Sequence, residues 1–112
     1  MALQSKDLLI ELGFNPKILG FKYILQALDY LKNDFMISCT MSNKVYPYIA
    51  ELNNVSVVSV RKSIKFAIDG AWKKQGTELR SKLFDVCLGN YAPSNSEFLG
   101  IVAKHLYWEN LK

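Results

Sequence analysis

The sequence predicts an all-α domain of six helices that contains a helix-turn-helix and no sheet. Apolar residues recur at helical spacing in several segments, and capping or turn residues separate these segments. Residues 55–60 are β-prone in composition, but the apolar positions that follow them continue at helical spacing. A chain of 112 residues that is 50% hydrophobic fits one domain, residues 1–112, with a substantial core. Any likeness to winged-helix folds is by analogy only.

The first two helices are predicted from their apolar spacing and from their start and stop signals. Residues 1–12 form the first helix, because Gly13 is placed as a helix stop. Asn15-Pro16 predicts the start of the second helix, with Pro at its first position, and Asn33-Asp34 predicts its end. Gly20 lies inside this helix, at a cost of up to about 1 kcal/mol relative to Ala, which indicates close contact with a neighbouring helix.

The supporting helix of the motif is predicted over about residues 41–52, with Thr40 or Ser42 as its cap. Pro47 lies inside that range, where a proline normally costs about 3 kcal/mol. We therefore expect a first turn to end or kink at Pro47, and this proline to take the first position of the segment that follows.

The turn of the motif follows directly. Ala50 is the small residue that lets the supporting helix approach the recognition helix. Asn54 stands four residues later, where the backbone must be left-handed, and Asn tolerates positive φ better than most residues. We expect Val55 to plug the turn and Ser56 to cap a recognition helix over about residues 57–74.

The recognition helix is predicted to have one buried face and one face that reads DNA. The apolar stripe at helical spacing is Val60, Ile64, Ala67, Ile68, Ala71 and Trp72. The residues predicted to project outward are Ser59, Arg61, Lys62, Lys65, Phe66 and Asp69. Recognition helices enter the major groove with their first turns. The predicted DNA-binding residues are therefore Ser56, Val58, Ser59, Arg61, Lys62, Lys65 and Phe66.

Positive charge is concentrated on the same segment. Residues 61–74 hold five basic side chains and one acidic side chain, and their net charge of +4 equals that of the whole chain. The rest of the chain is therefore balanced, and a local cationic patch of this kind suits a polyanion. Considered without the turn, these basic residues are better explained as the solvent-exposed face of an ordinary helix than as a DNA-binding surface. The charge and the turn spacing together favour DNA binding.

The two C-terminal helices are predicted from their caps. Gln75-Gly76-Thr77 stops the recognition helix and caps a short fifth helix. The apolar residues of that helix are Leu79, Leu83, Phe84 and Val86. Residues 87–93 are predicted to be a loop. Ser94 and Glu97 then form a capping box, so the last helix follows it and runs to about Glu109.

The sequence contains no metal, redox or enzyme motif. Cys39 and Cys87 lack metal-ligand spacing, so we expect free, inert thiols in a cytoplasmic protein. His105 is the single histidine, and we expect it on a helix surface or at a cap. No nucleophile, base and orienting group can be named together, so we expect no enzymatic activity and no cofactor. No signal peptide or long apolar run is present, so no membrane association is expected.

With these residues in view, nearly the whole chain resembles the C-terminal effector domain of the stage-zero sporulation transcription factor, a response regulator of endospore-forming bacteria. The blocks that carry the resemblance are Glu11-Leu12-Gly13, Ile18-x-Gly20-Phe21-x-Tyr23, Val45-Tyr46-Pro47-x-Ile49-Ala50, Ile64-x-x-Ala67-Ile68-x-x-Ala71-Trp72, Leu83-Phe84 and Pro93-Ser94-Asn95-Ser96-Glu97-Phe98. The resemblance implies a fourth helix that enters the major groove and head-to-tail dimers on tandem sites. It also implies contact with RNA polymerase sigma factor near the junction of the fourth and fifth helices.

The reading face departs from the pattern of that family. Where the family usually carries arginine, glutamate and histidine, this chain has Ser59, Arg61 and Phe66, and Lys62 and Lys65 replace arginines. An arginine can hold guanine through two hydrogen bonds, worth roughly 1–3 kcal/mol of discrimination, which serine cannot reproduce. We therefore expect attraction to phosphates to survive and base preference to differ from that of the family.

Two functions follow from these observations. The first is a sequence-specific regulator of transcription that binds double-stranded DNA and is linked to sporulation control. The second is an antagonist that pairs with the full-length sporulation regulator or with sigma factor. The second function is suggested because the residues that build the fold match the family, whereas the residues predicted to contact DNA differ from it. Because Met1 lies close to the first helix, we expect no receiver domain in front, in either a free-standing relative or an excised domain.

Overall fold

The computed structural model describes residues 5–32, 41–85 and 91–111. Within them the elements are α1 Ser5–Glu11, α2 Leu19–Leu31, the π-helical turn η2 Met41–Val45, α3 Tyr46–Asn53, α4 Val57–Lys73, α5 Glu78–Arg80, the π-helical turn η3 Ser81–Asp85 and α7 Asn95–Leu111. These residues contain six α-helices and no strand, so the predicted all-α class is confirmed. Of the described helices, none is long and apolar enough to span a membrane.

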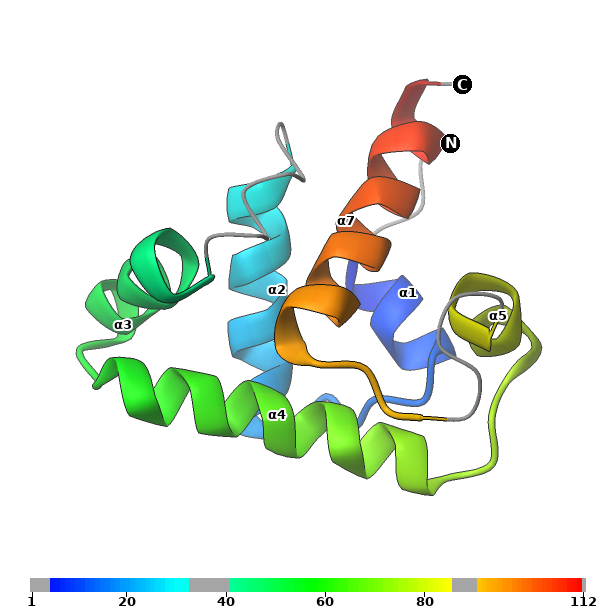
Figure 1. The fold of residues 1–112 in the computed structure, drawn as a ribbon, viewed down its shortest axis with the longest axis horizontal. Coiled ribbons are helices and arrows are strands. Elements are labelled where there is room, and N and C mark those ends of the chain that lie inside the picture. The colour runs from blue at the N-terminus through cyan, green and yellow to red at the C-terminus, as the bar shows by residue number, and fades with distance from the viewer. Residues whose placement is uncertain (1–4, 33–40, 86–90, 112) are drawn as a thin grey trace.

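The helix α4 runs along one side of the molecule, and α2 and α7 both pack against it (Figure 1). Gly20 lies in the first turn of α2 and is buried at this contact. A Cβ atom at Gly20 would run into the main chain of Ser63 and would lie 2.8 Å from Cβ of Ala67. The predicted close contact with a neighbouring helix is therefore confirmed at this glycine.

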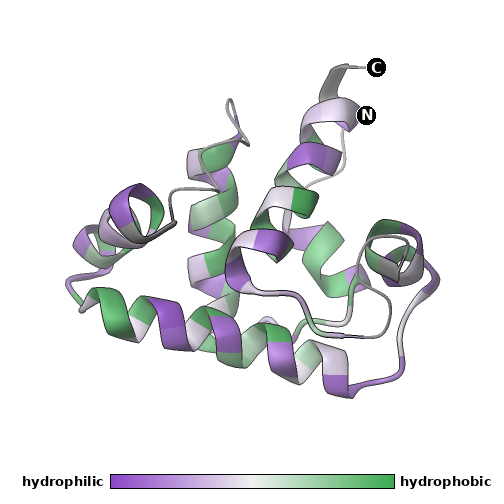
Figure 2. Ribbon diagram, viewed as in Figure 1, coloured by the Kyte–Doolittle hydropathy of each residue, from purple (hydrophilic) through white to green (hydrophobic). Residues whose placement is uncertain are grey.

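The core lies between these helices and includes the apolar stripe of α4. All residues of the predicted stripe are buried or partly buried: Val60, Ile64, Ala67, Ile68, Ala71 and Trp72. Phe98 of α7 completes an aromatic cluster, with ring centroids 5.1 Å from Phe14, 5.5 Å from Phe84 and 6.0 Å from Trp72. Figure 2 shows how hydrophobic and hydrophilic residues alternate along α4, as one buried and one solvated face require.

The start of α2 differs from the prediction. The helix begins at Leu19, with Ile18 in an extended conformation before it, and not at Asn15-Pro16. Oδ1 of Asn15 accepts a hydrogen bond from the backbone N–H of Lys17 at 2.9 Å, and the carbonyl of Asn15 accepts from the N–H of Ile18 at 3.2 Å. Asn15 therefore closes a turn in place of capping a helix, because a short polar side chain readily bonds the main chain two residues on.

The segment before α3 accommodates Pro47. The π-helical turn η2 leads directly into α3, and Pro47 lies in the first turn of α3, where its missing N–H breaks no helical hydrogen bond. The change from π to α geometry at Tyr46 lies next to the predicted break. Of the two predicted caps, Ser42 lies inside the π-helical turn, so it is not a cap, and Thr40 falls outside the described residues.

The caps predicted for the C-terminal helices are present. Oγ1 of Thr77 accepts a hydrogen bond from the N–H of Arg80 at 3.1 Å. The N–H of Ser94 donates to Oε1 of Glu97 at 2.8 Å, and the N–H of Glu97 donates to Oγ of Ser94 at 3.2 Å. The reciprocal bonds of the capping box therefore fix where α7 begins.

Arg80 closes the C-terminal end of α4, a role that the sequence did not predict. Its Nη1 donates to the carbonyls of Ala71 and Lys74 at 3.2 and 3.3 Å. Its guanidinium carbon also lies 5.0 Å from the ring centroid of Trp72, within the range of a cation–π contact. An arginine at this place satisfies carbonyl groups that a helix end otherwise leaves without partners.

Some predicted features lie outside the described residues. These are Cys39, Cys87, Val86 and the helix-stop signal Asn33-Asp34. His105, the single histidine of the chain, lies half-buried on α7. The structure therefore leaves the expectation of inert thiols as a prediction.

Candidate nucleic-acid interface

The turn between α3 and α4 has the backbone that the motif requires. Asn54 has φ 53° and ψ 48°, and no other described non-glycine residue has a positive φ. The N–H of Val55 donates to the carbonyl of Ala50 at 3.1 Å. The side chain of Val55 is 37% exposed, so the expectation that it plugs the turn is wrong. Main-chain hydrogen bonds close the turn and leave this valine on the outside.

The first turn of α4 is fixed by Ser56. This residue has an extended backbone, and its Oγ accepts a hydrogen bond from the N–H of Ser59 at 3.0 Å. Its hydroxyl also donates to Oγ of Ser59 at 3.0 Å. The helix spans Val57–Lys73, one residue shorter than the range 57–74 expected from the sequence. Its N-terminal end is therefore capped and exposed at the surface.

Four of the predicted DNA-binding residues form the outward face of α4. They are Val58, Ser59, Lys62 and Phe66, and all four are exposed. The side chain of Phe66 is 68% exposed and that of Val58 is 48% exposed. Apolar side chains at such positions can contact the methyl group of thymine, and a serine hydroxyl can bond a base edge. The outward face thus combines apolar contact and hydrogen bonding with one cation.

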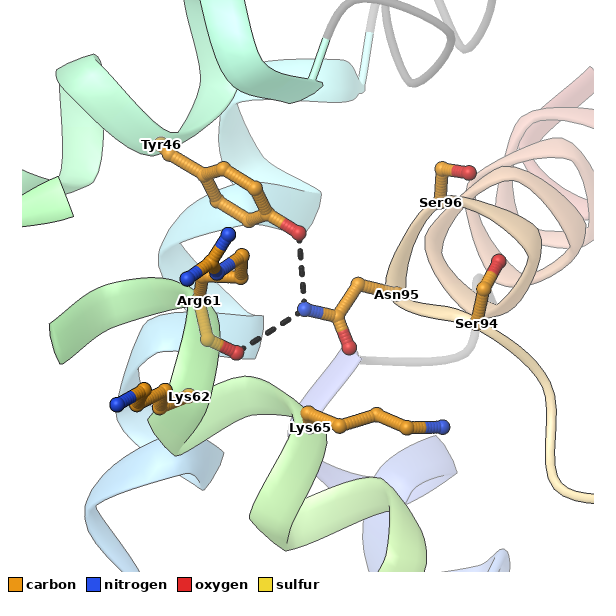
Figure 3. A pocket seen from close by; sticks show the side chains of 7 residues that line it. All are labelled: Tyr46, Arg61, Lys62, Lys65, Ser94, Asn95 and Ser96. Atoms are coloured by element: carbon orange, nitrogen blue, oxygen red, sulfur yellow. Dashed lines mark hydrogen bonds between the residues drawn. The ribbon is translucent and has the colours of Figure 1, made fainter. Parts of the chain in front are cut away.

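Arg61 and Lys65 lie on the flank of α4 that faces the start of α7 (Figure 3). Nζ of Lys65 lies 3.1 Å from Oδ1 of Asp69 and donates to the carbonyl of Pro93 at 3.1 Å. The side chains of Lys65 and Asp69 are 43% and 45% exposed, so solvent screens the ion pair and it contributes little stability. The structure therefore places the predicted residues on two adjoining surfaces of the helix.

A pocket of about 410 Å³ opens beside this flank, and we call it the flank pocket (Figure 3). Its lining residues are Tyr46, Arg61, Lys62, Lys65, Ser94, Asn95 and Ser96. Asn95 is only 7% exposed, and its Nδ2 donates to Oη of Tyr46 at 2.8 Å and to the carbonyl of Arg61 at 3.1 Å. Oδ1 of Asn95 is buried and accepts no hydrogen bond from any described residue. An unpaired buried acceptor costs about 1–3 kcal/mol.

Tyr46 brings a neutral hydroxyl to the flank pocket. Burial raises the pKa of Tyr46 above its ordinary value of 10.0, while the hydrogen bond from Asn95 and the charge of Arg61 oppose that rise. The phenol is therefore protonated at neutral pH. Because its oxygen accepts from Asn95, its own proton is available to a second partner.

The charge of the flank pocket is positive. Arg61 and Lys62 are exposed, and neither has an ion pair within the part of the chain that the structure describes. The lining residues include no carboxylate. Within the described residues no group of three His, Cys, Asp or Glu side chains is placed to hold a metal ion. The chemistry of this pocket suits an anion that accepts hydrogen bonds.

A second hollow, of about 380 Å³, lies on the other side of the outward face of α4. It is lined by Ile18, Leu19, Gly20, Lys62, Ser63 and Phe66, and we call it the apolar groove. Leu19 is 54% exposed and Phe66 is 68% exposed, and both line this groove. Lys62 lines both the apolar groove and the flank pocket, so it lies between them.

Tyr46 and Asn95 were not singled out from the sequence. Tyr46 stands in the turn predicted to end or kink at Pro47, and Asn95 stands inside the capping box of α7. Their side chains meet because α3, α4 and α7 converge, and positions 49 and 34 residues apart in the sequence come within hydrogen-bond distance. The available signal was that both residues stand in blocks that carry the family resemblance.

The chain was also compared with models of known protein families. A family model described as "Sporulation initiation factor Spo0A C terminal" matches residues 5–106. This range includes α3, the turn, the whole of α4 and the first part of α7, and therefore every residue that lines the two hollows.

Proposed function

The chain belongs to the family of sporulation initiation factor Spo0A C-terminal domains, and we propose that it is a sequence-specific regulator of transcription linked to sporulation control. It binds double-stranded DNA with α4 in the major groove. The observation that supports this most directly is the left-handed Asn54 followed by the capped, exposed start of α4. A major groove about 12 Å wide admits one such helix, with its first turns against the base edges.

The two surfaces of α4 have different roles in this proposal. Val58, Ser59 and Phe66 face the bases, with apolar contact to thymine methyl groups and hydrogen bonding from serine. Lys62, at the middle of the exposed face, and Arg61, on the flank, supply charge close to the DNA. Phosphate contacts position a protein on the duplex, and base contacts decide its sequence preference. Ser56 acts indirectly, because it caps the helix that carries the others.

Membership of the family also suggests which molecules this protein would bind besides DNA. The resemblance implies head-to-tail dimers on tandem sites and contact with RNA polymerase sigma factor near the junction of α4 and α5. A regulator of this kind works in the cytoplasm, where the chromosome of an endospore-forming bacterium lies.

Selection from random-sequence duplexes tests the proposal. The purified chain is incubated with the duplexes at one moderate salt concentration, and bound duplexes are sequenced over several rounds. We expect a defined motif that competes ahead of a scrambled duplex of the same composition. The salt concentration stays fixed because affinities for DNA at different salt cannot be compared. Enrichment of no motif would show that the chain does not read sequence.

A protein-binding antagonist is the second candidate, and the apolar groove is the observation that favours it. Leu19 and Phe66 are both more than half exposed at this groove, and such surfaces often mark contacts with proteins. The partner would be the full-length sporulation regulator or sigma factor. Co-purification of either partner, together with failure to enrich any DNA motif, would favour this candidate over the first.

A further inference from the structure

The apolar groove combines two large apolar side chains that come from different helices. Leu19 belongs to α2 and Phe66 to α4, and both are more than half exposed. Both line the same hollow of about 380 Å³. Exposure of apolar area to water is unfavourable, and a surface of this kind commonly marks a binding site. The groove is therefore suited to an apolar group of a ligand.

The close contact at Gly20 explains how α2 reaches the outward face of α4. A Cβ atom at Gly20 would run into the main chain of Ser63, so the first turn of α2 lies directly against the middle of α4 (Figure 1). Leu19 comes immediately before this glycine. Phe66 comes three residues after Ser63 and is its neighbour on the helix surface. Leu19 thus extends the surface that α4 presents.

The charge beside the groove favours DNA as the ligand. Lys62 is exposed, lines the groove and belongs to the outward face of α4. Lysine is depleted in protein–protein interfaces, whereas protein–DNA interfaces are rich in positive charge. The described residues that line the groove include no carboxylate, which would repel a nucleic acid. An apolar hollow bordered by a lysine is therefore better suited to DNA than to a protein partner.

Thymine carries the apolar group that unmodified bases offer in the major groove, the methyl group on C5. We propose that the apolar groove receives the methyl group of one thymine, with Leu19 as a specificity-determining residue outside the recognition helix. This inference rests on the proposed function, because it requires α4 in the major groove. It adds a wall from α2 to the base contact of Phe66, and the two side chains together enclose more of the methyl group than Phe66 alone.

Replacement of thymine by deoxyuridine removes this methyl group and leaves the hydrogen-bonding edge of the base unchanged. Each thymine on either strand of the motif that the native chain selects is replaced in turn, and affinity is measured at one salt concentration. We expect one thymine at which the native protein loses affinity about fourfold, the effect of removing one buried methyl group. Leu19→Ala should reduce that difference to less than about twofold, because one wall of the groove is lost.

The matched control is Leu52→Ala. Leu52 of α3 is exposed to the same extent as Leu19, at 54%, but it lines neither the apolar groove nor the flank pocket. This variant should keep the full difference between the thymine and deoxyuridine duplexes. Thermal unfolding of both variants checks the fold, and the ratio of affinities for the two duplexes does not depend on the fraction of folded protein.

Four outcomes would count against the inference. A selected motif without a thymine that responds to deoxyuridine would overturn it and leave the proposed function standing. An unchanged ratio of affinities in Leu19→Ala would overturn it as well, because the methyl group would then be contacted without Leu19. If the native protein binds both duplexes alike and Leu19→Ala loses sigma factor or the full-length regulator in co-purification, the groove binds protein instead. Failure of the native protein to bind any duplex would refute the proposed function itself, and the inference with it.

Discussion

Replacing Gly20 by alanine tests whether the contact between α2 and α4 is as close as the structure has it. A Cβ atom there would meet the carbonyl oxygen of Ser63 and would lie 2.8 Å from Cβ of Ala67 and 2.9 Å from the carbonyl carbon of Ser63. Both Ser63 atoms belong to the main chain of α4, which cannot move without shifting the helix. Overpacking of this kind costs about 1–3 kcal/mol or more. The gain in helix propensity is up to about 1 kcal/mol.

The matched control is Gly70→Ala. Gly70 lies inside α4, and a Cβ atom there would meet nothing within 4 Å. This substitution should therefore stabilise the protein by up to about 1 kcal/mol, because only the propensity changes. We expect Gly20→Ala to lower the free energy of unfolding by about 1–2 kcal/mol, so the two variants should differ by about 2–3 kcal/mol.

Urea unfolding followed by circular dichroism measures the difference. With a slope of about 1–3 kcal/mol per molar urea for a small domain, the two midpoints should lie roughly 1 M or more apart. The slope itself should be the same in both variants, because the surface exposed on unfolding does not change. A Gly20→Ala variant as stable as Gly70→Ala would refute the close contact and, with it, the position of α4 against α2.

The remaining predictions concern DNA binding and pH. Lys62→Ala should weaken binding to all duplexes and lower the salt slope by about one, while Lys104→Ala, at an exposed site on α7, should change neither. The triple variant Ser59→Arg, Arg61→Glu, Phe66→His should prefer the family's usual DNA site more than the native protein does, as measured by competitive binding at one salt concentration. An unchanged preference would show that these three residues do not determine which bases are recognised. Because burial raises the pKa of Tyr46, the free energy of unfolding should fall as pH rises above about 10. Tyr46→Phe should make this fall smaller, and unfolding experiments between pH 8 and about 11 measure the difference.

The elements that the sequence predicted well are those with complete local signals. Ser56 caps α4 and Ser94 with Glu97 caps α7, and in both cases one side chain bonds the N–H three residues on. The buried stripe of α4 followed from spacing alone, because a helix that packs on one side must repeat its apolar residues every three to four positions. Local chemistry and tertiary packing agree at these positions.

The features that the sequence did not predict depend on a choice between two local hydrogen-bonding patterns or on contacts between residues far apart in the sequence. Asn15 has two local hydrogen-bonding patterns available to it, and a turn displaced the expected helix cap. Tyr46 and Asn95 meet only because three helices converge, which local spacing cannot reveal. Arg61 lies on the flank of α4 and not on its outward face, and this could be recognised only once the position of α7 was known. The candidate interface could therefore be located on α4 from the sequence, but its division into two surfaces could not.

The bond between Asn95 and α4 has a consequence for how such a domain can change over evolution. Nδ2 of Asn95 is anchored to the main-chain carbonyl of Arg61, and the side chain of Arg61 takes no part in that bond. Any amino acid with a normal helical backbone offers the same carbonyl group. The hydrogen bond between α4 and α7 therefore does not depend on which amino acid occupies position 61. The side chain at this position, and with it a DNA contact, can change during evolution while the two helices keep their relative orientation.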